Sequence, residues 1–224
     1  MAKDFSHPKV VENYDEHIRK LIPGYELVHL QIQSILQTEL KSNARVVVAG
    51  CGTGYELEYL MRILPEVHFI VFDPSELMIA KAQQRFEHQA DLNRIEFHVA
   101  DHSILAQYTD QFDAALAILV SHFLNPEVKK AYFKALYSSL KDAGFCLSYD
   151  LMQFHNQSQI LQLQYLTQSL GLSEKQSQSM IERIADDFDL IPIDDMQQLL
   201  RNCGFRQTTC FAQVLNFYAI QSTK

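Results

Sequence analysis

The sequence predicts an α/β fold: a doubly wound, mainly parallel seven-stranded sheet with an antiparallel C-terminal hairpin and a helical lid. From Val46 onward, short apolar runs alternate with segments of helical periodicity, as in parallel sheets with right-handed crossover helices. Near the end of the chain, two strand-like runs joined by a short turn replace this alternation. Residues 1–43 and 151–192 lie outside it and have a mostly helical pattern. The length of 224 residues suits one domain, 1–224.

Each strand of the alternating part is expected where a β-branched or aromatic apolar run stops at glycine or at a polar residue. Strands buried on both faces of a parallel sheet have continuous apolar sequences. The run Phe112–Val120 is almost wholly apolar, so we expect it near the centre of the sheet. The five expected strands are Val46–Ala49, His68–Phe72, Ile95–Val99, Phe112–Val120 and Phe145–Tyr149.

The helices are predicted from apolar residues at helical spacing and from signals at their ends. Pro65 ends the first helix, Ser75 suits the N-cap of the second, and Gly204 follows the last. The expected helices are Gly54–Leu64, Ser75–Ala90, Glu127–Leu140 and Asp194–Asn202. The two strands of the final hairpin are expected at Phe205–Cys210 and Val214–Ile220.

The two segments outside the alternation are expected to form the lid. Residues 1–43 contain the cluster Ile22-Pro23-Gly24-Tyr25, and residues 151–192 form an insertion rich in Gln and Ser. Open α/β sheets bind ligands outside the carboxyl ends of their strands. Both segments are therefore predicted to cover that edge, and the insertion is expected to set the choice of substrate.

Composition and charge disfavour several classes of partner. The chain has 19 Lys and Arg against 27 Asp and Glu, a formal net charge of −8, and no dense basic run, which disfavours nucleic acid as the main partner. No stretch approaches the ~18 apolar residues of a membrane span, and residues 1–10 lack the apolar core of a leader. None of the four cysteines forms C-x-x-C, so we expect free thiols and a cytoplasmic location. An acidic chain with a closed lid suits a small-molecule substrate.

The strongest motif joins the first strand to the first helix. Val46–Ala49 runs directly into Gly50-Cys51-Gly52-Thr53-Gly54, a G-x-G-x-G turn. Glycines permit a tight turn and a close approach of ligand to backbone, and the helix start presents free N–H groups. Asp73, at the end of the next strand about 20 residues on, can accept hydrogen bonds from both hydroxyls of a ribose. The combination predicts a ligand that contains a nucleoside.

Dinucleotide binding is the main alternative interpretation of this turn. Its fingerprint is G-x-G-x-x-G, and Tyr55 stands where the third glycine would fall. Glu56, early in the helix, would repel a phosphate but not a sulfonium amino acid, so we favour S-adenosylmethionine. A glycine turn without any ligand is the remaining alternative.

Polar residues also follow the third and fourth strands. Asp101 can bind an adenine amino group or cap a helix, and the two roles are compatible. The loop Leu119-Val120-Ser121-His122-Phe123 should face the transferred methyl group. His122 either acts as a base or lines the pocket, and Phe123 is expected to form part of the pocket wall. His98 and His102 do not share a helical face, and we predict no metal site.

At these residues the chain resembles the class I S-adenosylmethionine-dependent methyltransferases, whose fold is Rossmann-like. Their first motif matches Val46–Gly54, the second acidic position Asp73, the third Ala100-Asp101, and the fourth strand Phe112–Val120. The resemblance implies S-adenosyl-L-methionine as cofactor and S-adenosyl-L-homocysteine (SAH) as product. The cofactor-binding residues it implies are Gly50, Cys51, Gly52, Thr53, Gly54, Asp73, Pro74, Met78, Asp101, His102 and Leu119. The residues expected to face the substrate are Tyr14, Tyr25, His122 and Tyr149, with His122 as the catalytic candidate.

A closer resemblance is to the carboxy-S-adenosylmethionine synthases, which convert S-adenosylmethionine into a carboxylated form. It implies a shared architecture that includes the lid insertion, and a homodimer. The stretches that carry it are Ile22-Pro23-Gly24-Tyr25, Phe123-Leu124-Asn125-Pro126, Gly171-Leu172-Ser173-Glu174, Cys203-Gly204-Phe205 and Leu215-Asn216-Phe217.

Two departures from that family favour the plain cofactor. The family places an arginine in the helix before Gly-Phe to hold the extra carboxylate, whereas this chain has Leu199, with Arg201 two residues away. The family's first motif also usually lacks the G-C-G-T-G present here. We therefore expect methyl transfer to an unidentified small-molecule acceptor. A carboxy-S-adenosylmethionine synthase-like transferase and a non-catalytic S-adenosylmethionine-binding protein remain as alternatives.

Overall fold

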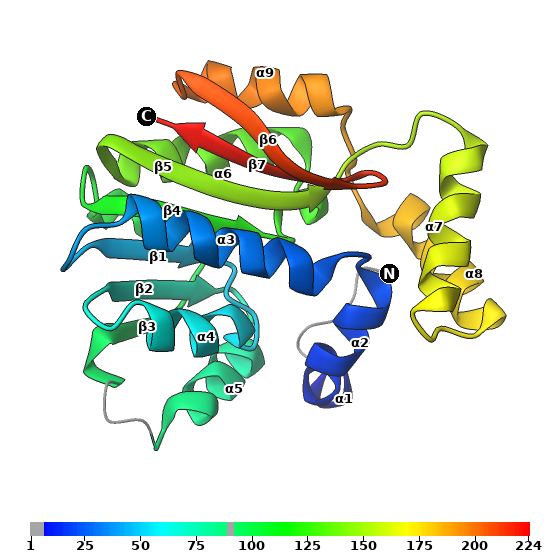
Figure 1. The fold of residues 1–224 in the computed structure, drawn as a ribbon, viewed down its shortest axis with the longest axis horizontal. Coiled ribbons are helices and arrows are strands. Elements are labelled where there is room, and N and C mark those ends of the chain that lie inside the picture. Colours follow the sequence, from blue (N-terminus) through cyan, green and yellow to red (C-terminus); the bar gives the residue numbers. More distant parts are fainter. Residues whose placement is uncertain (1–6, 89–91) are drawn as a thin grey trace.

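A computed structural model describes residues 7–88 and 92–224, and in it one sheet lies between two layers of helices (Figure 1). The strand order is β3-β2-β1-β4-β5-β7-β6. Neighbouring strands from β3 to β5 run parallel, whereas β7 runs antiparallel to both β5 and β6. The strands are β1 (Arg45–Ala49), β2 (His68–Asp73), β3 (Ile95–Val99), β4 (Phe112–Ile118), β5 (Leu140–Leu151), β6 (Gln207–Val214) and β7 (Phe217–Thr223). The predicted doubly wound sheet with an antiparallel hairpin is confirmed.

β1 and β4 lie side by side within the sheet, and the chain reverses its direction of winding between them. Val47 of β1 stands opposite Ile70 of β2 on one side and Ala115 of β4 on the other. Strands β2 and β3 extend the sheet on the first side, and β5 extends it on the second. The carboxyl ends of β1 and β4 therefore diverge into opposite helices, which opens the crevice where such sheets bind ligands.

The fourth and fifth strands differ in length from those expected. The expected fourth strand reaches Val120, but β4 ends at Ile118 because Leu119 adopts a φ of 58° and the chain leaves the sheet there. β5 is longer than expected: its first residue, Leu140, pairs with Phe112, and its last, Leu151, lies opposite Phe217.

Helices cover both faces of the sheet. Side chains alternate along β1, so Val46 and Val48 join one core with α3, α4 and α5, while Val47 and Ala49 join the other with α6 and α9. The helices are α1 (Pro8–Glu12), α2 (Tyr14–Leu21), α3 (Tyr25–Glu39), α4 (Tyr55–Ile63), α5 (Glu76–Phe86), α6 (Pro126–Ser139), α7 (Gln157–Ser169), α8 (Glu174–Asp187) and α9 (Ile193–Cys203). Three short 3-10 turns are η1 (Leu92–Arg94), η2 (His102–Gln107) and η3 (Ser121–Phe123).

The predicted helix ends hold in most cases. Ser75 caps α5, accepting a hydrogen bond from the Met78 amide at 3.3 Å. The end predicted for this helix at Ala90 lies outside the described residues. The strands of the final hairpin begin later than expected, because α9 continues to Cys203 and the turn between β6 and β7 falls at residues 215–216.

Only part of residues 1–43 lies where a lid was expected. Val28, Ile32 and Leu36 of α3 are buried against the sheet, so α3 belongs to a helix layer and not to a lid. α1 and α2 lie beyond the carboxyl ends of the strands, on the same side as α7 and α8 of the insertion (Figure 1). In the described part of the chain, no helix is long and apolar enough to span a membrane.

Candidate active site

The glycine loop connects β1 to α4 at the crevice, and two of its glycines serve different purposes. At Gly50, where φ is 78°, a Cβ atom would lie 2.5 Å from Cγ2 of Val120, so no larger residue fits against the loop after β4. At Gly52, where φ is 51°, the nearest atom to an added Cβ is Cε1 of Tyr14, 4.0 Å away. The loop is thus packed tightly at Gly50 and open at Gly52, where a ligand can reach the backbone.

Asp73, the last residue of β2, is fixed beside this open side of the loop. Its Oδ2 accepts a hydrogen bond from the Gly52 amide at 3.0 Å, and its Oδ1 accepts one from the Ser75 amide at 2.9 Å. Burial raises the pKa of this carboxyl group, while the two amides oppose the shift. An ionised carboxylate offers about four acceptor positions, so it keeps capacity for a ligand hydroxyl.

Further carboxyl groups, those of Asp15 and Glu56, lie close to the glycine loop. Burial, with a smaller contribution from repulsion by Asp15 and Asp73, raises the pKa of Glu56 to about 7. Burial also raises the pKa of the Tyr14 hydroxyl, with contributions from the same three acids. Arg85 pairs with Asp15 and Glu58 and offsets part of this charge. The electrostatic environment of the loop therefore favours a cationic ligand and disfavours a phosphate.

Asp101 follows β3, next to the end of β2. The Ala100 amide donates to the Asp73 carbonyl at 3.1 Å, which brings the two strand ends together. Asp101 is exposed and caps η2, accepting a hydrogen bond from the Ser103 amide at 2.8 Å. The capping role is present in the structure, and the adenine contact stays a prediction. His102 packs edge-on against Tyr132.

The other residues expected at the cofactor differ in exposure. Cys51, Thr53 and Met78 are buried, and the Thr53 hydroxyl donates to Asp15 of α2. Pro74 is exposed beside Asp73. Leu119 lies at the base of the pocket described below.

The loop after β4 places a histidine on a buried aspartate. Leu119 takes a left-handed conformation, and its amide donates to the Tyr149 carbonyl of β5 at 2.6 Å. This turn brings Nδ1 of His122 within 2.8 Å of Oδ1 of Asp150, and the Ser121 hydroxyl donates to Oδ2 of Asp150 at 2.7 Å. Sequence reasoning missed Asp150. Its signal was an acidic residue ending an apolar strand that neighbours β4.

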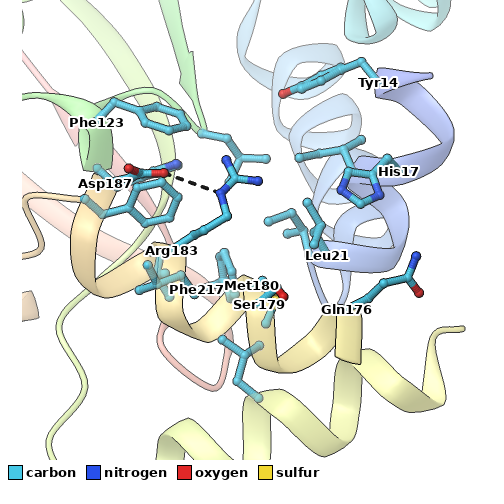
Figure 2. Close-up of a pocket in the computed structure, with 18 of the residues that line it drawn as sticks. Tyr14, His17, Leu21, Phe123, Gln176, Ser179, Met180, Arg183, Asp187 and Phe217 are labelled. Carbon is cyan, nitrogen blue, oxygen red and sulfur yellow. Dashed lines mark ion pairs between the residues drawn. The ribbon is translucent and has the colours of Figure 1, made fainter. Parts of the chain in front are cut away.

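A pocket of about 330 Å³ opens between α2, α8 and this loop (Figure 2). Tyr14 and His122, two of the residues predicted to face the substrate, line it, and their contact with a substrate stays a prediction. Tyr25 and Tyr149 do not line it. Tyr25 is buried against His29 and Tyr55, and the Tyr149 hydroxyl donates to the Pro23 carbonyl at 3.3 Å. The apolar lining includes Ile18, Leu21, Phe123, Met180, Phe188 and Phe217.

The pocket also contains a cation that sequence reasoning missed. Arg183 of α8 projects into it and forms an ion pair with Asp187 at 3.5 Å (Figure 2). Leu199, where a cation was sought, lies on α9 and packs against the core on the opposite face of the sheet. Arg201 is exposed and contacts Gln198 and Thr208. A cation therefore lines the pocket from α8, although the residue matched to the family's arginine is Leu199.

No cluster of His, Cys, Asp or Glu suited to a metal ion occurs within residues 7–88 and 92–224. His98 lies 2.8 Å from Glu96 on β3, and its ring packs edge-on against Tyr108.

Comparisons with known proteins show which proteins this chain is similar to. A methyltransferase domain family matches residues 46–144. A carboxy-S-adenosyl-L-methionine synthase of Desulfotalea psychrophila is 25% identical over 236 residues, which cover 100% of this chain and 93% of that protein. One of Campylobacter fetus subsp. fetus is 26% identical, covering 93% of this chain and 89% of that protein.

Among solved structures, magnesium protoporphyrin IX methyltransferase from Synechocystis PCC 6803 with bound SAH superposes with a TM-score of 0.65 and 18% identity. The superposition covers 92% of this chain and 85% of the Synechocystis protein. The TM-score shows a shared fold, and at 18% identity the comparison shows the fold alone. The domain match, the relatives aligned along nearly the whole chain and the fold together support a class I S-adenosylmethionine-dependent methyltransferase related to the carboxy-S-adenosyl-L-methionine synthases.

Proposed function

We propose that this enzyme transfers the methyl group of S-adenosylmethionine to a small molecule held in the pocket between α2 and α8, with His122 as general base. The observation that carries the proposal is the 2.8 Å contact between His122 and Asp150 on the wall of that pocket. A volume of about 330 Å³ lies within the range of small-ligand sites, roughly 300–1,000 Å³.

The glycine loop fits the proposed cofactor by shape and by charge. The open side at Gly52 admits a ligand close to the backbone, and Asp73 stands beside it to accept hydrogen bonds from ribose hydroxyls. Asp15, Glu56 and Asp73 together favour positive charge, which suits a sulfonium and an ammonium group and opposes a pyrophosphate. When bound, the cofactor supplies an electrophilic methyl group, so the protein must chiefly position and deprotonate the acceptor.

One wall of the pocket adjoins the loop. Tyr14 lines the pocket, and its Cε1 is the nearest atom to a Cβ added at Gly52, 4.0 Å away. Val120, two residues before His122, packs against Gly50. An acceptor in the pocket would therefore lie close to a cofactor on the loop, and such positioning can lower a reaction barrier by ~7–11 kcal/mol.

His122 is suited to remove the proton of the acceptor. Its Nδ1 is 2.8 Å from Oδ1 of Asp150, so the neutral imidazole carries its proton on Nδ1 and donates it to that carboxylate. Nε2 is then left as a hydrogen-bond acceptor. When the acceptor's oxygen or nitrogen takes the methyl group, the S–C bond would break with its electron pair left on the sulfur of SAH, the acceptor's proton would pass to Nε2 of His122, and Asp150 would stabilise the resulting imidazolium. Phe123 and Phe188 pack on the ring at centroid distances of 4.3 and 4.7 Å and exclude water from it.

Synthesis of a carboxylated cofactor is a second candidate. The relatives with that name align along nearly the whole chain. That reaction needs a cation near the transferred carbon, and Arg183 places one in the pocket. The first candidate is preferred because the His122–Asp150 pair provides a base, which methyl transfer to a protonated acceptor uses directly.

We also propose that the enzyme is cytoplasmic and forms a homodimer. Three of the four cysteines are buried free thiols, which agrees with a reducing cytoplasm. The net charge of −8 agrees with a small-molecule partner and disfavours nucleic acid. A homodimer is supported by exposed apolar side chains on α3 and α7, such as Leu27, Leu30 and Tyr165, and sedimentation equilibrium would test it.

Isotope transfer tests the function directly. The enzyme would be incubated with S-adenosylmethionine deuterated on its methyl group and with a small-molecule extract of cells, and products would be searched by mass spectrometry. We expect a labelled metabolite with wild-type protein and a loss of at least about a hundredfold in its rate of formation with His122→Gln. SAH titration by calorimetry serves as the control, because both proteins should bind it equally.

The other outcomes separate the candidates. A carboxylated S-adenosylmethionine product would select the second candidate. SAH binding without any labelled product would indicate a non-catalytic binding protein. Failure of the wild-type protein to bind SAH would contradict both enzymatic candidates.

A further inference from the structure

The Arg183 guanidinium has no task in the methyl transfer proposed above, yet it projects into the acceptor pocket (Figure 2). We infer that the acceptor is a largely apolar molecule with a carboxylate that binds the guanidinium of Arg183, separate from the hydroxyl or amine that takes the methyl group beside His122. This inference rests on the proposed function, since it concerns the same pocket and names the class of acceptor.

The geometry of Arg183 leaves its outer donors directed at the pocket. Its contact with Asp187 is made through Nε, at 3.5 Å. A guanidinium carries five N–H donors, and the four on its two Nη atoms form the fork that matches a carboxylate. Figure 2 shows this end of the side chain extending from α8 toward Tyr14. An acid in the pocket can therefore bind the two Nη atoms while Asp187 holds Nε.

The ion pair with Asp187 does not account for the position of Arg183. The 3.5 Å separation is long for a charge-assisted hydrogen bond, which is usually about 2.7–2.9 Å. Arginine four residues before aspartate is also the less favourable order on a helix. The Asp187 side chain is 3% exposed, whereas the Arg183 side chain is 48% exposed. The carboxylate is therefore buried in the pocket wall, and the guanidinium is accessible from the pocket.

The remaining lining suits an apolar body with one anionic end. Lys175 and Arg183 place two cations in the pocket against the single carboxylate of Asp187, in a chain whose formal net charge is −8. Most of the other walls are aliphatic or aromatic, including Leu21, Met180 and Phe217. The single charge of a carboxylate balances the excess of one cation over Asp187, whereas a phosphate monoester carries nearly two charges and would leave an excess of negative charge in the pocket.

Paired ligands that differ only in charge test this inference. Octanoate with octanamide, and phenylbutyrate with phenylbutyramide, would be titrated by calorimetry against the full chain, with and without saturating SAH. We expect each acid to bind about tenfold or more tightly than its amide. Arg183→Gln should remove that preference, and Arg183→Lys should restore only part of it because lysine lacks the fork.

A matched control separates binding from a general charge effect. Lys20→Gln removes a positive charge from α2 at a residue outside the pocket lining and should leave the preference unchanged. Equal binding of acid and amide, an undiminished preference in Arg183→Gln, tighter binding of phenyl phosphate than of phenylbutyrate, or no binding of either acid would each overturn the inference. Because SAH is titrated separately, loss of the proposed cofactor site would be seen independently of acid binding.

Discussion

Nδ1 of His122 and Oδ1 of Asp150 lie 2.8 Å apart, and the two side chains are 5% and 1% exposed. The residues come from neighbouring strands, since His122 follows β4 and Asp150 lies near the end of β5. Asp150 does not line the pocket, so it acts on an acceptor only through His122 and is a positioning residue.

Asp150→Asn should therefore slow methyl transfer without weakening the cofactor. An asparagine amide can donate to Nδ1, which would move the imidazole proton to Nε2 and leave no base facing the acceptor. We expect the rate of labelled-product formation to fall by about 10²–10⁴ while SAH affinity stays within about twofold. Ser121→Ala removes a single hydrogen bond to Asp150 and should cost less than about tenfold. Equal losses in both variants would argue against the positioning role.

Asp73→Asn should weaken SAH binding by about 1.5–3 kcal/mol, the range for hydrogen bonds to a charged group. Calorimetric titration of SAH measures this loss. Asp101→Asn is the matched control at the next strand end, because Asp101 is exposed and already caps η2. A larger loss for Asp101→Asn than for Asp73→Asn would reverse the assignment of the two carboxylates.

Gly50→Ala and Gly52→Ala should fail in different ways. At Gly50 an added Cβ would lie 2.5 Å from Val120, so we expect about 2–4 kcal/mol less stability in urea unfolding. At Gly52 the space is open, so alanine should cost only about 1 kcal/mol of backbone strain while weakening SAH binding by about tenfold or more. Wild-type SAH affinity in Gly52→Ala would place the cofactor elsewhere.

The buried Glu56 should make the unfolding free energy depend on pH. Burial raises its pKa from 4.5 to about 7, so between these values the folded chain holds a proton that the unfolded chain releases. Stability should therefore fall as pH rises through this window, by about 2–3 kcal/mol from this group. Above about pH 7 the contribution should change no further.

Urea unfolding across that range, compared with Glu56→Gln, isolates the effect. The comparison is needed because burial lowers the pKa of His29 to about 4, which makes stability rise with pH over part of the same window. The wild type should lose stability relative to Glu56→Gln as the pH increases. A constant difference between the two proteins would show that Glu56 is already ionised in the folded state.

The sequence was sufficient to predict the sheet and the cofactor loop because both depend on local patterns. Continuous apolar runs identified β1 to β4 within about two residues, and the glycines of residues 50–54 with Asp73 marked the ligand edge. The early end of β4 was not predictable, because the left-handed backbone of Leu119 has no signal in an apolar run.

The acceptor pocket was harder to predict because its residues meet only through tertiary packing. Arg183 and His122 lie far apart in the sequence and line one cavity only because α8 folds back over the end of β4. Tyr149 was predicted to face the substrate, but its ring lies in the core, and its neighbour Asp150 contacts His122 instead. Leu199 matches the family's arginine only in linear order, because α9 packs on the opposite face of the sheet.

The two faces of α2 constrain attempts to redirect this enzyme to other acceptors. Asp15 on one face holds Thr53 and Arg85 around the glycine loop, while Ile18 and Leu21 face the acceptor pocket. Substitutions in α2 therefore affect cofactor and acceptor together. α8 lines the pocket, whose lining in the described part of the chain includes no residue of the glycine loop, so α8 is the better helix to randomise in a library for altered specificity.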